Sequence, residues 1–318
     1  MLLGTLCVPT LTTVNKRMKL SVIFPVFNQF ELATAAIELA IRNLSGDNNV
    51  EVVILDNGSP TPYVPEGATH PKEGLVGTGG VRIIHARSEK NTGVYPTFWE
   101  GLHHATGDVI AFFHSDLMVA EKGWDTRVLE AFEADPTLGM MGFIGSNEID
   151  SSGGRGAGTC SNFQGGTYTL QTQQGKAMMQ RMSNIWKGSP AEAHGRRITG
   201  LEPAAVVDGC SMIFRRSCLE AIPQRPDFPP HHFYDRLLSC ETREKGFTVA
   251  VLGIECDHIS GQTVNQEPGY STMAQEWAEA HGLTMEGAHN WDTILYRMAE
   301  LMWLKEYRDL KRVVPCRV

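Results

Sequence analysis

The chain has 318 residues, of which 42% are hydrophobic and 20% charged, and its net charge is −8. This acidic balance argues against a protein that binds nucleic acid through charge alone or docks on a membrane through a broad basic face. The seven cysteines form no CxxC pair, which excludes a zinc knuckle and favours a reducing compartment. No apolar run approaches about 18 residues, so we predict no transmembrane segment and a cytoplasmic location.

Strand patterns alternate with helical patterns over residues 19–132. Short apolar runs bounded by turn-forming residues predict four strands, at 20–26, 50–55, 81–85 and 108–113. Helical spacing predicts a helix after Asn28, with that side chain as its cap, and further helices over 96–105 and 124–132. Strands that alternate with helices of this length indicate βαβ units on a parallel sheet.

The pattern is less regular in the second part of the chain. Further strands are predicted within 139–144, 204–215 and 248–254, with helices over 235–245 and within 271–310. Gly, Ser, Gln and Thr dominate residues 151–200, which predicts an insertion or lid. We therefore divide the chain into an N-terminal extension (1–18), a first half (19–144), an insertion (145–203), a second half (204–270) and a helical C-terminal extension (271–318).

Polar residues follow three of the predicted strands in the first half. Asp56 ends the second strand, Asn91 and Gly93 lie in the loop after the third, and Asp116 follows the fourth. Ligands of parallel α/β sheets bind beyond the carboxyl ends of the strands, where such loops converge. One acidic residue at a strand end is commonly a helix cap or turn former. Polar residues after three successive strands favour a binding site instead.

Four stretches of the first half resemble motifs of one enzyme family. They are 21–28 (SVIFPVFN), 55–59 (LDNGS), 91–101 (beginning NTG) and 105–108 (ATGD). Together they resemble the family 2 glycosyltransferases of the GT-A fold, and a weaker match resumes over 204–263. The resemblance implies a GT-A-like, Rossmann-type α/β fold, with a mostly parallel sheet flanked by helices. It also implies that residues 19–144 bind a nucleotide sugar.

The resemblance places a donor site around the first two strands. The backbone near Pro25 and the carboxylate of Asp56 would hold the base and ribose of a nucleoside-diphosphate sugar, and a carboxylate can accept hydrogen bonds from such groups. UDP-sugar is the donor class that the resemblance favours. The residues assigned to the donor side are Pro25, Phe27, Asn28, Asp56, Asn91, Gly93 and Ser115.

His114-Ser115-Asp116 falls where the family has its Asp-x-Asp metal motif. A diphosphate leaving group needs a divalent cation to absorb its charge, and Mn²⁺ or Mg²⁺ would serve. Asp116 is the first candidate ligand, and His114 replaces the other acid of the motif. His114 could instead touch a phosphate or a ribose. His258 follows a predicted strand, where the family often has a histidine that completes the metal site.

The second half supplies the candidates for the acceptor side. Asp235 resembles the aspartate that acts as catalytic base in inverting members, although Tyr234 replaces the glutamate that precedes it. Alternatively, Asp235 caps its helix or is a first-turn acid favoured by the helix dipole. Asp208 and Gly209 resemble acceptor-side residues, with Gly209 allowing a sugar close to the backbone. A simple turn explains Asp208 equally well.

The sequence therefore predicts an inverting, metal-dependent transfer of a sugar to an acceptor hydroxyl. The acceptor stays open among glycans, lipid-linked molecules, proteins, small molecules and modified nucleic-acid bases. Two alternatives stay open as well. The first is a non-catalytic nucleotide-sugar or glycan-binding module of degenerate GT-A fold, which the departures at His114 and Tyr234 favour. The second is a sugar-phosphate nucleotidyltransferase, against which the PVFN turn after the first strand counts.

Overall fold

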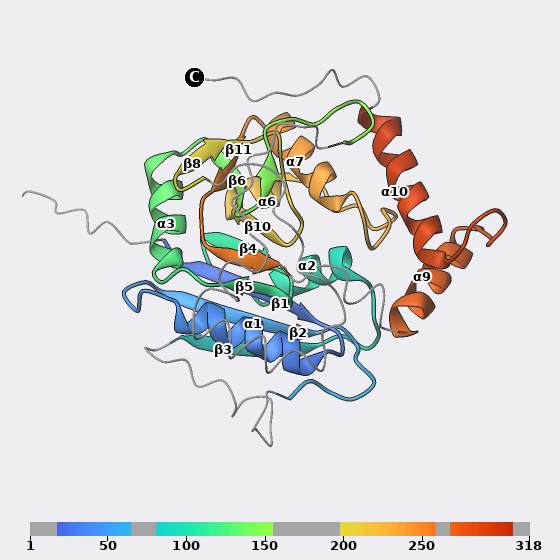
Figure 1. The fold of residues 1–318 in the computed structure, drawn as a ribbon, viewed down its shortest axis with the longest axis horizontal. Coiled ribbons are helices and arrows are strands. Elements are labelled where there is room, and N and C mark those ends of the chain that lie inside the picture. The colour runs from blue at the N-terminus through green and yellow to red at the C-terminus, as the bar shows by residue number, and fades with distance from the viewer. Residues whose placement is uncertain (1–17, 65–80, 155–197, 259–267, 308–318) are drawn as a thin grey trace, which may run out of the picture.

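The computed structural model of the chain describes residues 18–64, 81–154, 198–258 and 268–307. Its centre is an eight-stranded mixed sheet with the order β3-β2-β1-β4-β10-β6-β11-β8 (Figure 1). Two small two-stranded sheets, β12-β5 and β7-β9, lie beside it. This arrangement confirms the predicted α/β class with a mostly parallel sheet flanked by helices.

The first half of the chain forms the parallel part of the sheet. β1 (Leu20–Val26) pairs in parallel with β2 (Val50–Asp56) on one side and with β4 (Val109–Phe113) on the other. β3 (Arg82–Arg87) adds to β2 in parallel at the edge. Every residue of β1, β2 and β4 is buried, which is why these strands are continuous apolar runs rather than alternating ones.

The rest of the main sheet is mixed, with β10 and β8 antiparallel to their neighbours. β10 (Ser211–Arg215) lies antiparallel between β4 and β6 (Leu138–Gly142). β11 (Thr248–Leu252) then pairs in parallel with β6, and β8 (Leu201–Pro203) closes the edge antiparallel to β11. A short antiparallel pair joins β7 (Gly145–Ser146) to β9 (Val206–Val207).

Helices cover both faces of the sheet and enclose two apolar cores (Figure 1). α1 (Phe30–Arg42) and α3 (Trp124–Ala134) contribute to the core on one face. Four helices contribute to the core on the other face, namely α2 (Val94–Leu102), α6 (Arg216–Ala221), α7 (Tyr234–Glu244) and α10 (Trp291–Tyr307). α9 (Pro268–Ala280) packs on α10, in red in Figure 1. None of the described helices has both the length and the apolar character that a membrane span requires.

The predicted cap of the first helix is wrong. The helix begins at Phe30, and its N-cap position is Gln29, which makes no side-chain capping bond. Asn28 and Gln29 both have left-handed backbones, with φ of 49° and 46°. The chain therefore turns sharply after β1, and the Asn28 backbone N–H is held by the Ser59 hydroxyl at 3.0 Å.

Much of the predicted insertion lies outside the described residues. Its first residues, through Gly154, and its last, from Ile198 on, are described, and they contain β7 and β8. Residues 1–17 and 308–318 also lie outside, so the division of the chain into segments stays a prediction. The predicted loop over 59–80 is described only as far as residue 64.

Candidate active site

The candidate site lies where the order of strands reverses along the chain. β1 is followed by β2 and β3 on one side, whereas β4 returns to its other side, so the loops after β1 and β4 diverge. The loop after β4 carries His114 and Asp116 and leads into β5 (Leu117–Val119). β5 pairs antiparallel with β12 (Cys256–His258), in a register that sets His258 opposite Leu117. This small sheet brings His258 beside Asp116.

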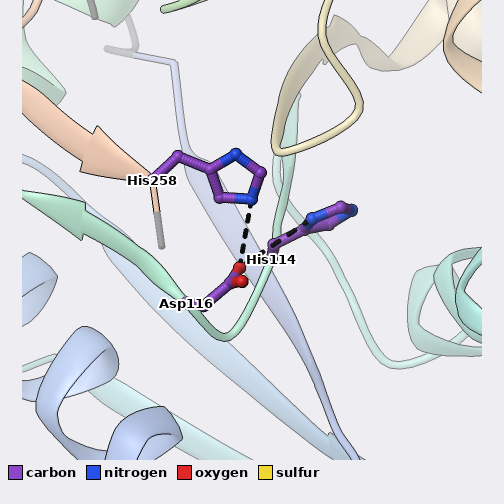
Figure 2. Close-up of side chains that lie close together, drawn as sticks. All are labelled: His114, Asp116 and His258. Atoms are coloured by element: carbon purple, nitrogen blue, oxygen red, sulfur yellow. Dashed lines mark ion pairs between the residues drawn. The ribbon is translucent and has the colours of Figure 1, made fainter. Parts of the chain in front are cut away.

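His114, Asp116 and His258 form a compact cluster of side chains that could hold a metal ion (Figure 2). His258 Nε2 lies 3.3 Å from Asp116 Oδ1, and His114 Nδ1 lies 3.9 Å from the same oxygen. One ligand atom from each residue falls within 4.8 Å of the others. The side chains are 22%, 15% and 14% exposed for His114, Asp116 and His258, so a small ion can reach them.

Electrostatics favour the protonation states that bind metal. Burial opposes ionisation of Asp116, but the adjacent His258 and His114 outweigh it and hold the pKa of that carboxyl below its usual range. Burial also lowers the pKa of His114, so its imidazole is neutral at neutral pH. One carboxylate and two imidazoles can together coordinate a divalent transition metal such as Mn²⁺.

Asp208 adjoins the same cluster. A ligand atom of Asp208, one of Cys210 and one of His258 also lie within 4.8 Å of one another. The Asp208 carboxylate accepts a hydrogen bond from the Cys210 backbone N–H at 3.0 Å, which forms the turn before β10. Burial and the nearby Asp208 raise the pKa of the Cys210 thiol well above its usual range, so the thiol keeps its proton. The acceptor role predicted for Asp208 stays a prediction. Its place beside His258 makes it a candidate metal ligand as well.

Tyr234 and Asp235 are the first two residues of α7. The N-cap position is Phe233, so Asp235 is a first-turn acid and not the cap. Asp235 Oδ1 accepts hydrogen bonds from the Arg236 backbone N–H at 2.8 Å and from the Arg236 guanidinium at 3.0 Å. Both Asp116 and Asp235 are close enough to His114 to influence its protonation. The hydroxyl of Tyr234, the residue before Asp235, lies 2.7 Å from His114 Nε2, so the predicted base adjoins a residue that contacts the cluster.

The space above Gly209 is filled from within the protein. A Cβ on this residue would lie 2.5 Å from the Tyr234 hydroxyl oxygen. Close approach of Tyr234 therefore accounts for the glycine without a bound sugar. The role predicted for Gly209 in acceptor binding stays a prediction.

The turn after β2 is the main feature of the predicted donor side. The Asp56 carboxylate accepts hydrogen bonds from the backbone N–H groups of Ser59 and Tyr63, each at 2.9 Å, and pairs with Arg87. These three contacts shape the turn, and they leave the carboxylate buried. Sequence reasoning missed Arg87, because no local pattern connects the end of β3 with the end of β2.

Asn57 links this turn to the loop after β3. Its side chain donates to Asn91 Oδ1 at 2.9 Å and accepts from the Thr92 backbone N–H at 3.0 Å. Asn91 Oδ1 in turn accepts from the Gly93 backbone N–H at 2.9 Å. The structure thus brings Asp56, Asn91 and Gly93 together through Asn57. This residue belongs to the LDNGS motif, but the sequence did not reveal its role.

The remaining donor-side candidates lie around these turns. Pro25 is buried in β1 opposite Leu55, and Ser115 lies half-buried between His114 and Asp116. Phe27 packs against the start of α9, where a Cβ on Gly269 would lie 2.5 Å from Phe27 Cζ. α9 therefore borders the donor side, a contact that the sequence did not indicate.

His231 is a further residue that the sequence did not single out. Its ring packs edge-on against Tyr270, with 4.9 Å between the ring centroids. Burial, followed by the nearby His232 and His114, lowers the pKa of His231 to about 3. His231 therefore places a neutral imidazole against the Tyr270 ring of α9.

Comparison with known proteins assigns the chain to a family. The sequence model described as "Glycosyl transferase family 2" matches residues 21–221, more than half of the chain. The family match and the fold define a glycosyltransferase with a GT-A-like sheet, as predicted. The chain belongs to glycosyl transferase family 2. This membership leaves no support for the nucleotidyltransferase alternative.

Several solved glycosyltransferase structures are similar to the chain. GalNAc-T7, solved with UDP, GalNAc and Mn²⁺, has a TM-score of 0.53 at 13% identity, over 93% of this chain and 55% of that one. Mannosyltransferase PcManGT from Pyrobaculum calidifontis, in complex with GDP-Man and Mn²⁺, has a TM-score of 0.47 at 16% identity, over 92% and 72%. S. aureus TarS 1–349 has a TM-score of 0.44 at 15% identity, over 90% and 71%. At such identities the GalNAc-T7 likeness supports a shared fold alone.

Proposed function

We propose that the chain is an inverting, divalent-metal-dependent glycosyltransferase that moves a sugar from a nucleoside-diphosphate sugar to an acceptor hydroxyl. The observation that supports this most strongly is the cluster of His114, Asp116 and His258, whose His114 contacts Tyr234, the residue before Asp235, in a chain of this family. UDP-sugar is the first donor to test, because the sequence motifs favour it. GalNAc-T7, which has a similar fold, was solved with UDP and Mn²⁺.

Asp116 and His258 are the residues that would hold Mn²⁺ or Mg²⁺, with His114 as the third ligand. The donor set of one carboxylate and two imidazole nitrogens within 4.8 Å fits Mn²⁺ better than Mg²⁺, because Mg²⁺ prefers oxygen ligands. When bound, the ion supplies charge neutralisation for the diphosphate that leaves. The turn formed by Asp56 and Asn57 would hold the nucleotide next to this cluster.

Asp235 is the proposed general base. Its carboxylate would take the proton of the acceptor hydroxyl while the acceptor oxygen bonds to the anomeric carbon and the bond from that carbon to the diphosphate oxygen breaks. Arg236 fixes Oδ1 through its backbone N–H and its guanidinium. A carboxylate held in this way is positioned before the acceptor arrives, which lowers the entropic barrier of the step. Attack from the face opposite the leaving group inverts the anomeric centre.

Release of UDP from UDP-sugars, with and without acceptor, tests this proposal. Asp235→Asn should lower transfer by about 10²- to 10⁴-fold, the range of general-base catalysis, and leave UDP binding unchanged. Asp116→Asn should weaken Mn²⁺ binding as well as transfer. Asp135→Asn is the matched control, because this carboxylate accepts hydrogen bonds from Thr137 in the turn after α3. If Asp116→Asn and Asp235→Asn both kept full transfer, the assignment would be wrong.

The same assay separates the transferase from a non-catalytic binding module. The replacements at His114 and Tyr234 favour the module, since both lie at positions where the family has acids. A module should bind UDP-sugar in the presence of Mn²⁺ and release no UDP over hours. Glycans, lipid-linked sugars, small metabolites and modified nucleic acids should be compared as acceptors in parallel.

A further inference from the structure

The two departures from the family pattern touch each other. The Tyr234 hydroxyl oxygen lies 2.7 Å from His114 Nε2, a hydrogen-bond distance. His114 stands in the loop after β4, and Tyr234 begins α7, so the contact joins the two halves of the chain. His114 and Tyr234, which stand where the family has acids, therefore form a contacting pair.

Packing fixes the position of the Tyr234 hydroxyl. The Tyr234 ring stacks on Tyr95, with centroids 6.0 Å apart and an interplanar angle of 20°, and meets Phe98 edge-on. Its hydroxyl end lies over Gly209, where no side chain could fit. Because the ring is enclosed on these sides, the hydroxyl oxygen is a fixed point to which the imidazole can bond.

The His114 ring is in turn held on two sides. It stacks on Phe98, with centroids 6.2 Å apart and an interplanar angle of 16°, while Nε2 faces Tyr234. The other ring nitrogen, Nδ1, faces Asp116 Oδ1 at 3.9 Å. A histidine that binds a metal through one nitrogen commonly donates the N–H of the other to a fixed oxygen, which sets the orientation of the ring.

We propose that Tyr234 is a positioning residue, whose hydroxyl holds His114 through Nε2 and turns Nδ1 toward Asp116 as the metal-facing nitrogen. The consequence for metal binding rests on the proposed function, whereas the orientation of the ring does not. Tyr234 and His114 then act as one unit, and Gly209 provides the space that the unit needs. The pair replaces two acids with a hydroxyl and an imidazole.

A double-mutant cycle with two readouts tests this inference. Tyr234→Phe removes only the hydroxyl, and Tyr95→Phe is the matched control because it removes another hydroxyl from the same aromatic cluster. The first readout is the ¹⁵N chemical shift of His114 Nε2, identified by its loss in His114→Ala. The second is the affinity for Mn²⁺ in the presence of UDP, measured from the electron paramagnetic resonance signal of free Mn²⁺.

Tyr234→Phe should shift the His114 Nε2 resonance, and Tyr95→Phe should leave it in place. Tyr234→Phe should also weaken Mn²⁺ binding by about 10- to 100-fold, the usual effect of losing such a partner, and have no further effect in the His114→Ala background. An unchanged Nε2 resonance, or equal losses of affinity in both backgrounds, would overturn the inference. If the wild-type chain binds no Mn²⁺, the proposed function fails, and the Nε2 resonance alone decides the role of Tyr234.

Discussion

Glu51 is a fully buried carboxylate at the end of the sheet opposite the candidate site. It accepts hydrogen bonds from Lys19 Nζ at 2.5 Å, from the Ser21 hydroxyl at 2.6 Å and from the Thr106 backbone N–H at 2.5 Å. These contacts join the start of β1, the start of β2 and the loop before β4. We expect Glu51→Gln to lower the free energy of unfolding by about 3 kcal/mol, since it breaks a buried ion pair. Urea denaturation measures this, with the exposed Glu220→Gln as control.

The same residue makes stability depend on pH. Burial alone would raise the pKa of Glu51, but Lys19, Ser21 and Thr106 outweigh it and hold the pKa below its ordinary value of 4.5. A depressed pKa stabilises the folded state above pH 4.5, and this contribution is lost as the pH falls through the folded pKa. The stability gap between wild type and Glu51→Gln should therefore narrow on acidification below pH 4.5. A gap that stayed constant down to pH 3 would contradict this role.

Gly58 and Gly46 separate the effect of backbone strain from that of a steric clash. Both have a positive φ, of 68° and 85°, so alanine at either position costs about 1 kcal/mol of conformational strain. Gly46 has open space where a Cβ would project, whereas a Cβ on Gly58 would lie 2.2 Å from the Lys90 backbone. Gly58→Ala should therefore destabilise by roughly 1 to 3 kcal/mol more than Gly46→Ala. It should also weaken UDP binding, which isothermal titration can measure, whereas Gly46→Ala should not.

At the scale of elements, Asp292 links α9 and α10 to the loop before α7, which leads into Tyr234 and Asp235. Asp292 at the start of α10 accepts a hydrogen bond from the Tyr270 hydroxyl of α9 at 2.5 Å and pairs with His232 Nε2 at 2.6 Å. His232 and Phe233 both have a positive φ, of 66° and 54°, immediately before Tyr234 and Asp235. Strained backbone of this kind persists only where surrounding contacts hold it.

We expect Asp292→Ala to loosen α9 and the loop before α7. Amide hydrogen exchange should speed up in α9 and at residues 231–235, and transfer should fall, because the strained loop places Asp235. Glu306→Gln is the control, since this residue pairs with Arg225 near the other end of α10 and is 38% exposed. Loss of exchange protection spread evenly over the sheet would instead indicate global destabilisation.

Whether the sequence predicts an element depends on how local its cause is. The buried runs of β1, β2 and β4 carry their own signal, and so do the amphipathic patterns of α3 and α7. No local signal predicts the direction of β10, because an apolar run looks the same in parallel and in antiparallel pairing. The αL turn at Asn28 and Gln29 was also missed, since neither residue is a glycine.

The candidate site divides in the same way. The motifs around Asp116, His258 and Asp235 make each of them a candidate by resemblance, and the structure places His258 Nε2 3.3 Å from Asp116 Oδ1. The hydrogen bond between His114 and Tyr234 could not be predicted, because it depends on how α7 packs against the end of β4. The ion pair of Asp56 with Arg87 depends likewise on the register of β2 and β3, which pairs these two residues.

At the scale of the whole molecule, metal and donor binding should stabilise both halves together, because Asp116 comes from the first half and His258 from the second. A ligand present at 100 times its Kd adds about 2.7 kcal/mol to the folded state. For a chain of this size, that corresponds to a rise in Tm of roughly 4 °C with Mn²⁺ and UDP. EDTA and Asp116→Asn should each remove the rise, whereas Asp135→Asn should keep it. A rise that survived both would show that UDP binds without a metal at the cluster, and would contradict the proposed role of Asp116.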